Sequence, residues 1–166
     1  MNEYNDYIAI TRRWLKDYNL FKVTVKNMNK DIEAQQQILD LGSVIPIAKY
    51  GDMPKGGSPE LNAVEMAADD RLKRQQDIYK AMMNRDDIQR HIDRIDSAID
   101  SLEEEDREVL QEHYLEGDSW EHIGHNRHYS EQWARKKGGK ALRQVAFILF
   151  GLKAKPPEQI KFVFAQ

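Results

Sequence analysis

The beginning of the chain contains a long stretch without a single helix-breaking residue. Residues 4–41 hold no proline and no glycine, and their apolar and aromatic residues recur every seven positions. They form two rows: Tyr7, Trp14, Phe21 and Met28 in one, and Tyr18, Val25, Ile32 and Leu39 in the other. Because residues at this spacing share one face of a helix, the stretch predicts one long amphipathic helix. Thr11 and Gln35 are polar members of the same stripe, which is common where a coiled-coil seam fixes its register.

A second long helix is predicted after a connector that no regular element would tolerate. Residues 42–58 carry two of the five prolines and four of the nine glycines. The sequence Ser58-Pro59-Glu60 then forms a helix start, with a capping hydroxyl, a proline at the first helical position and an acid in the first turn. We expect this helix to reach about Leu102. Its apolar stripe loses phase around residues 84–87, where a kink or a break is expected.

Each long helix presents an apolar stripe that needs an apolar partner. The second helix carries Leu61, Val64, Ala68, Leu72, Tyr79 and Met82 in its first half, and Ile88, Ile92, Ile95, Ile99 and Leu102 in its second half. Two such helices joined by a connector are most simply an antiparallel hairpin, or half of a dimer in which each chain supplies part of the seam. We therefore expect residues 1–92 to serve oligomerisation or partner binding, with a homodimer as the favoured assembly.

Composition excludes several classes of protein. The chain of 166 residues has no cysteine, which rules out a disulfide framework, a thiolate nucleophile and a zinc finger with the usual ligands. Its longest uninterrupted apolar run, from Val145 to Phe150, is far shorter than the roughly 20 residues of a membrane-spanning helix. The N-terminus lacks the pattern of an export signal. We expect a cytoplasmic protein with no membrane partner.

No catalytic or cofactor-binding pattern stands out in the sequence. His122, His125 and His128 recur every three residues, but the third falls in an expected turn and no carboxylate completes a metal site. The pair Gly138-Gly139 between lysines lacks the preceding strand and the sequence pattern of a phosphate-binding loop. We expect no enzyme activity, no cofactor and no bound metal.

Charge is distributed unevenly along the second half of the chain. Residues 93–118 carry eleven acids and two arginines, a net charge of −9, although the whole chain has a net charge of −3. Residues 119–155 carry eight cations and two acids, a net charge of +6. The basic segment favours a nucleic-acid partner, and the acidic segment, which would repel a phosphate backbone, is expected to face away from that partner.

Helix-start signals divide this charged half into three helices. The sequence Ser101-Leu102-Glu103-Glu104 has the form of a capping box, and Gly117 is expected to close the helix that follows. Ser119 begins a helix of about two turns, and Ser130 caps a longer basic helix soon after it. A short helix, a tight turn and a longer basic helix are typical of a helix-turn-helix, whose second helix enters the major groove of DNA.

Residues 95–148 resemble region four of bacterial sigma factors, and more closely the region-four-like domain of phage late-gene transcription activators of the RinA and ArpU type. The matching positions are Leu102, Arg107, Val109, Leu110, Ser119, Glu121, Ile123, Ser130, Arg135, Lys140, Ala141, Leu142 and Arg143. The resemblance implies sequence-specific binding of double-stranded promoter DNA and a contact with RNA polymerase. The family usually carries a hydrophobic residue where Arg127 and Lys137 stand, and often a glycine at the position of His128.

Two glycines fall inside the expected recognition helix. Gly138 and Gly139 each cost a helix about 1 kcal/mol relative to alanine. Either packing and DNA keep the helix intact, or it frays after Lys137. Close approach of the preceding helix over Gly138 would favour an intact helix.

The expected DNA-binding surface comprises the first turns of this helix and the turn before it. Gln132 suits the edge of adenine, Arg135 suits guanine, and Glu131 suits the amino group of cytosine. The remaining cations are better placed for phosphates, which position a protein without reading sequence. The complete set of expected DNA-binding residues is Arg127, Ser130, Glu131, Gln132, Trp133, Arg135, Lys136, Lys137, Lys140 and Arg143. The residues expected to face inward are Ala134, Ala141 and Val145.

We therefore expect an all-α protein with a long N-terminal helix and a helical hairpin or coiled coil, followed by a C-terminal helix-turn-helix domain. The hairpin region covers residues 1–92 with a linker at 42–58, the DNA-binding domain covers 93–152, and a tail covers 153–166. The expected function is sequence-specific regulation of transcription, of phage or prophage late genes, at promoter DNA with RNA polymerase. The alternative is a coiled-coil adaptor with a degenerate helix-turn-helix that binds RNA polymerase or another protein in place of DNA.

Overall fold

The computed structural model describes residues 3–41 and 59–154, and the regular structure of these residues is entirely helical. The elements are α1 (Glu3–Lys16), α2 (Tyr18–Leu41), α3 (Pro59–Asp100), α4 (Glu104–Gln111), the π-helical turn η1 (Glu112–Glu116), α5 (Trp120–Asn126), α6 (Glu131–Phe150) and the 3₁₀ turn η2 (Gly151–Ala154). The predicted all-α fold class is confirmed, and none of the described helices is long and apolar enough to cross a membrane. The expected linker, with the helix signals at Gly42 and Ser58, and most of the expected tail lie outside the described residues.

The described chain divides into two compact units. One contains residues 3–22 and 90–154, and the other contains residues 23–41 and 59–89. The boundary near residue 90 lies close to the expected division after residue 92. The first 22 residues are placed differently from the expectation, because they group with the C-terminal helices and not with the hairpin.

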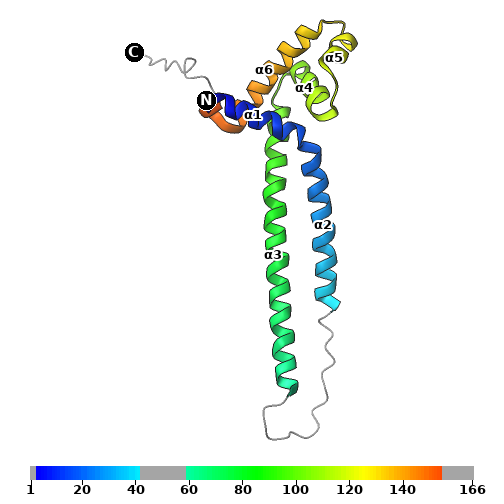
Figure 1. The fold of residues 1–166 in the computed structure, drawn as a ribbon, viewed down its shortest axis with the longest axis vertical. Helices are drawn as coiled ribbons and strands as arrows, with labels where there is room; N and C mark the ends of the chain where they lie inside the picture. The colour runs from blue at the N-terminus through cyan, green and yellow to red at the C-terminus, as the bar shows by residue number, and fades with distance from the viewer. Residues whose placement is uncertain (1–2, 42–58, 155–166) are drawn as a thin grey trace, which may run out of the picture. The chain divides into compact units, whose positions relative to one another are not determined.

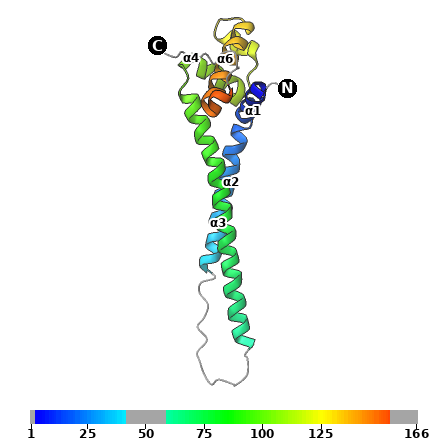
Figure 2. The ribbon, with the colours of Figure 1, turned by 90° about the vertical axis from the view of Figure 1, so that its left-hand side faces the viewer.

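The unit of residues 23–41 and 59–89 is a pair of antiparallel helices contributed by α2 and α3 (Figures 1 and 2). The guanidinium of Arg85 donates to the side-chain oxygen of Asn29 over 2.9 Å and ties the two helices together. Ile32 is buried, as the heptad pattern predicts. On α3 the buried residue is Ile78, whereas the neighbouring Tyr79 is 64% exposed. At this position the buried residue of α3 therefore precedes the expected one, Tyr79, by one residue.

The two long helices differ in continuity from the sequence prediction. The N-terminal stretch is interrupted at Asp17, between α1 and α2, so the prediction of one unbroken helix over residues 4–41 is wrong there. Leu15 and Tyr18 on either side of Asp17 are both buried, and the amides of Asp17 and Phe21 still donate to the carbonyls four residues before them, each over 2.9 Å. Conversely, α3 runs without interruption through residues 84–87, where a kink or break was expected. Arg85 satisfies its charge locally, with its guanidinium 2.7 Å from Asp86.

The unit of residues 3–22 and 90–154 is built around α6. Its buried apolar residues include Ile95, Val109, Leu110, Ile123, Ala134, Ala141, Leu142 and Val145. The rings of Tyr7 and Trp14 on α1 lie 5.0 Å and 5.2 Å from the ring of Phe150, at the C-terminal end of α6. Arg94 near the end of α3 donates to the backbone carbonyl of Leu149 over 2.7 Å. The N-terminal helix is thus an integral part of the unit that contains α6.

The passage from α3 into α4 does not use the predicted capping box. The hydroxyl of Ser101 donates to the carbonyl of Ala98, and α4 begins only at Glu104, with no side-chain cap at Glu103. The expectation fails because α3 continues to Asp100 and takes Ser101 into its last turn. At the other end, α4 widens into the π-helical turn η1, which was not predicted. Gly117, at φ 89°, ends η1 in the left-handed conformation expected of a helix stop.

Candidate nucleic-acid interface

The elements α5 and α6 form a helix-turn-helix whose two starts are capped as the sequence predicts. The hydroxyl of Ser119 accepts a hydrogen bond from the backbone amide of His122 over 3.1 Å. The hydroxyl of Ser130 accepts one from the backbone amide of Trp133, also over 3.1 Å. Each cap satisfies an amide that a helix start otherwise leaves unpaired. The caps therefore fix where both helices begin.

The turn between the two helices is tight and closed by backbone hydrogen bonds. The amide of His128 donates to the carbonyl of His125, and the amide of Tyr129 donates to the carbonyl of Gly124 over 2.8 Å. His128 has φ 59°, the left-handed conformation that favours glycine. A β-carbon at Gly124 would lie 2.9 Å from the backbone carbon of Ser130, so only glycine lets α5 approach the start of α6 this closely.

The helix α6 is continuous across its two glycines. α6 runs from Glu131 to Phe150, and Gly138 is buried beneath the indole of Trp120 on α5. This close approach is the arrangement that favoured an intact helix. The ring of His113 stacks on Trp120 with centroids 3.5 Å apart. Burial lowers the pKa of His113, which keeps the ring neutral at pH 7 while it hydrogen-bonds the carbonyl of Asp118.

Arg127, expected to contact phosphate from the turn, points instead to α4. Its guanidinium lies 2.8 Å from the carboxylate of Glu108 and 2.6 Å from that of Glu112, and the side chain is only 20% exposed. The hydrogen bond to Glu112, opposed by partial burial and reinforced by Glu108, raises the pKa of the guanidinium above its ordinary value. Arg127 therefore fastens the turn to α4.

Lys137 and Lys140 also direct their ammonium groups to α4, around the fully buried Asp106. The ammonium of Lys137 lies 2.5 Å from Glu105 and 3.0 Å from Oδ1 of Asp106. That of Lys140 donates to Oδ2 of Asp106 over 2.9 Å. Oδ1 of Asp106 accepts no well-directed hydrogen bond in the described part of the chain and is held by the Lys137 ion pair.

The acidic segment was expected to face away from the basic surface, but acids of α4 and η1 contact α6 and the turn before it. Acids of α4 and η1 neutralise Arg127, Lys137 and Lys140 within the domain. Burial of the Asp106 carboxyl group opposes its ionisation, but the hydrogen bond from Lys140 and the contact with Lys137 outweigh burial and lower its pKa. Three of the expected phosphate contacts thus have a structural partner.

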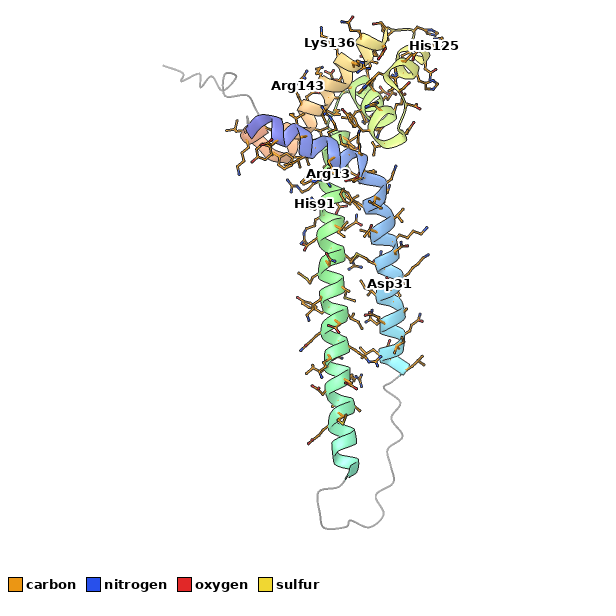
Figure 3. All side chains as sticks on the ribbon, viewed as in Figure 1. Arg13, Asp31, His91, His125, Lys136 and Arg143 are labelled. Carbon is orange, nitrogen blue, oxygen red and sulfur yellow. The ribbon has the colours of Figure 1, made fainter. Side chains whose placement is uncertain are left out.

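The outward face of α6 carries the remaining polar residues of the expected surface. Glu131, Gln132, Arg135, Lys136 and Arg143 are all exposed. Arg135 donates to Glu131 one turn before it, at 2.8 Å and 2.6 Å, while both side chains stay open to solvent. Lys136 and Arg143 form no ion pair within residues 3–41 and 59–154. Figure 3 shows Lys136 toward the N-terminal end of α6 and Arg143 farther along the same helix.

Trp133 takes a different position from the expected DNA-facing one. It is half-buried and packs against a hydrophobic core cluster formed by Val109, Ile123 and Ala134. Its outer face carries the ring of Tyr129, stacked with centroids 4.1 Å apart and an interplanar angle of 19°. Sequence reasoning missed Tyr129. Its place directly before the capping serine was the available signal, because a hydrophobic residue there often packs on the first turn of the helix.

The three regularly spaced histidines do not gather into a metal site. Nε2 of His122 is 3.0 Å from the side-chain amide of Asn126, and His128 lies in the turn after α5 with φ 59°. In the part of the chain that the structure describes, no group of three histidine, aspartate or glutamate side chains is arranged to hold a metal ion.

Comparisons of the chain with protein-family models, with curated proteins and with solved structures found no match.

Proposed function

We propose that this chain is a sequence-specific DNA-binding protein that regulates transcription. The observation that carries the proposal is the pair α5 and α6, capped at Ser119 and Ser130 and joined by a tight turn, with α6 presenting exposed polar residues at its start. In proteins with this arrangement, the first residues of the second helix contact base edges in the major groove. Gln132 and Arg135 are the side chains with the chemistry to read adenine and guanine.

The supporting electrostatics are more modest than the sequence count suggests. Acids of α4 and η1 pair with Arg127, Lys137 and Lys140. Among the described residues, this leaves Lys136 and Arg143 of α6 without an ion pair, whereas Arg135 is paired with Glu131. A domain with few free cations binds random duplex weakly and depends on base contacts for its affinity. This charge pattern favours a reader of sequence over a general DNA-coating protein.

The regulatory setting is a narrower proposal. Control of phage or prophage late genes, together with RNA polymerase in the bacterial cytoplasm, rests on the resemblance of residues 95–148 alone. A homodimer is also proposed, supported by Leu72, Tyr79 and Met83, which leave an exposed apolar row on α3 at seven- and four-residue spacing. Sedimentation equilibrium of the full chain tests the dimer, which predicts twice the mass of 19.5 kDa.

The experiment that tests DNA binding begins with selection of duplexes from a randomised pool by the full chain. The selected duplex and a scrambled duplex are then titrated at several salt concentrations. We expect a preference of at least about a thousandfold for the selected duplex. We also expect affinity to fall with salt with a logarithmic slope of about −2 per chain, from Lys136 and Arg143.

The second candidate is the protein-interaction adaptor. It is favoured by the ion pairs of Arg127, Lys137 and Lys140, because an adaptor does not need these cations for contacts with DNA. It is also favoured by Ile148 and Leu152, two exposed apolar residues beyond the basic part of α6. An adaptor predicts no enrichment from the pool and no affinity for any duplex in low salt. It also predicts saturable binding to purified bacterial RNA polymerase in the absence of DNA.

A further inference from the structure

Tyr129 presents an aromatic ring at the leading end of the recognition helix. The ring stacks on Trp133, which is itself fixed against the domain core, and yet the Tyr129 side chain remains 53% exposed. The backbone is fixed as well, since the amide of Tyr129 donates to the carbonyl of Gly124 over 2.8 Å. Tyr129 is therefore a partly exposed aromatic residue whose backbone is fixed by a hydrogen bond and whose ring is fixed by stacking.

Local packing accounts for only one side of this residue. A hydrophobic side chain before a helix cap commonly packs on the first turn, and the stack on Trp133 serves that purpose. Packing does not require the other half of a large ring to stay in water. The hydroxyl of Tyr129 also makes no hydrogen bond within the described residues, so no polar contact explains the exposure.

The position of the ring matches one chemical feature of duplex DNA. The exposed residues Gln132 and Lys136 follow Tyr129 along the same end of α6, where recognition helices meet base edges. In the major groove, the 5-methyl group of thymine is the apolar feature that distinguishes one base, and apolar side chains contact it. A ring already fixed by stacking loses little conformational freedom on making that contact.

We propose that Tyr129 is a specificity-determining residue whose ring packs on the 5-methyl group of a thymine in the bound duplex. The inference rests on the proposed DNA-binding function and adds a base that Gln132, Arg135 and Glu131 do not explain. Covering one methyl group stabilises a complex by about 0.8 kcal/mol, which is about a fourfold change in affinity.

The test exchanges thymine for uracil, which removes the methyl group and keeps every hydrogen-bonding group. Each thymine of the duplex selected by the wild-type chain is replaced in turn by deoxyuridine, and affinities are measured at one salt concentration. We expect one position at which the exchange weakens binding about fourfold. If every thymine tolerates the exchange, the inference is overturned while the DNA-binding function stands. If no duplex is enriched at all, both are overturned.

Two variants assign the effect to the ring. The Y129A chain should bind the thymine and uracil duplexes equally at the sensitive position, and the Y129F chain should keep the wild-type preference. Affinity for a scrambled duplex and the unfolding temperature of each variant serve as controls for the fold. A Y129A chain that retains the preference would place the methyl contact elsewhere. A Y129F chain that loses it would assign the role to the hydroxyl, and either result refutes the proposed contact.

Discussion

The indole ring of Trp120 occupies the space that a β-carbon at Gly138 would need. Two ring carbons would lie less than 3.0 Å from that atom, closer than real contacts allow. One residue later the situation is different, because a β-carbon at Gly139 would have only Arg143 Nη1 within reach, at an ordinary 3.7 Å. Two adjacent glycines in one helix thus have different reasons to be there, and substitution separates them.

Replacing Gly138 with alanine is expected to destabilise the domain by about 1 to 3 kcal/mol, because the new methyl group overpacks against Trp120. The matched change at Gly139 should stabilise it by up to about 1 kcal/mol through helix propensity alone. Urea unfolding followed by circular dichroism measures both. Equal effects of the two substitutions would contradict the close contact between α5 and α6.

The left-handed residue of the turn gives a second prediction. His128 at φ 59° carries a conformational cost of roughly 1 kcal/mol that glycine avoids, so H128G should raise the unfolding free energy by about 0.5 to 1 kcal/mol. The control is H125G, within α5, which should lower it by about 1 kcal/mol. Thermal unfolding of the two variants should therefore shift in opposite directions. A loss of stability in H128G would argue against this turn geometry.

The buried carboxylate of Asp106, which lies between Lys137 and Lys140, is expected to stabilise the domain. D106N keeps the shape but leaves Lys140 without its main partner, and we expect a loss of about 2 kcal/mol. E104Q is the matched control, since Glu104 is an exposed acid in the same first turn and its replacement should change stability by less than about 0.5 kcal/mol. Denaturant unfolding at pH 7 compares the two.

The same carboxylate predicts how stability depends on pH. The pKa of Asp106 is lowered in the folded state, so its contribution is fully present above the unfolded value of about 3.9 and is lost as the pH falls through the lower folded value. The difference in stability between the wild type and D106N should therefore stay constant from pH 7 to pH 5 and shrink below about pH 4. A difference that persists unchanged at pH 2 would mean that the ion pairs do not stabilise the domain.

Substitution by alanine should affect DNA binding at the exposed cations Lys136 and Arg143, and folding stability at the ion-paired Arg127. K136A and R143A should each reduce the steepness of the salt dependence of DNA binding by about one unit and leave folding stability within about 0.5 kcal/mol. R127A should do the reverse, costing about 2 kcal/mol of stability through its two ion pairs, with little change in the salt slope of the folded protein. Salt titrations and unfolding curves of the three variants check this division. An R127A chain that folds normally and loses salt dependence would return Arg127 to the DNA-binding surface.

Local signals predicted the parts of this fold that depend on neighbouring residues. The serine caps at Ser119 and Ser130 and the stop at Gly117 follow from side-chain and backbone chemistry within one helical turn. The contact over Gly138 was anticipated as a condition for an intact helix, although the sequence did not choose between an intact and a frayed one.

The remaining features depend on residues far apart in the chain. Whether Lys137 faces a phosphate or an acid is decided by Asp106, which lies on another helix, and helical spacing carries no information about that partner. The shift of the buried position from Tyr79 to Ile78 likewise follows from packing between helices. The charge count of residues 93–118 was correct, but a sum over sequence does not show which acids meet which bases.

The contact between Tyr7 and Phe150 joins residues at opposite ends of the described chain. In a folding unit closed by such a contact, α1 is synthesised well before α6. Because the chain is synthesised from its N-terminus, Tyr7 and Trp14 lack their contact with Phe150 until α6 emerges from the ribosome. The nascent chain therefore completes this unit only after translation has passed its final helix.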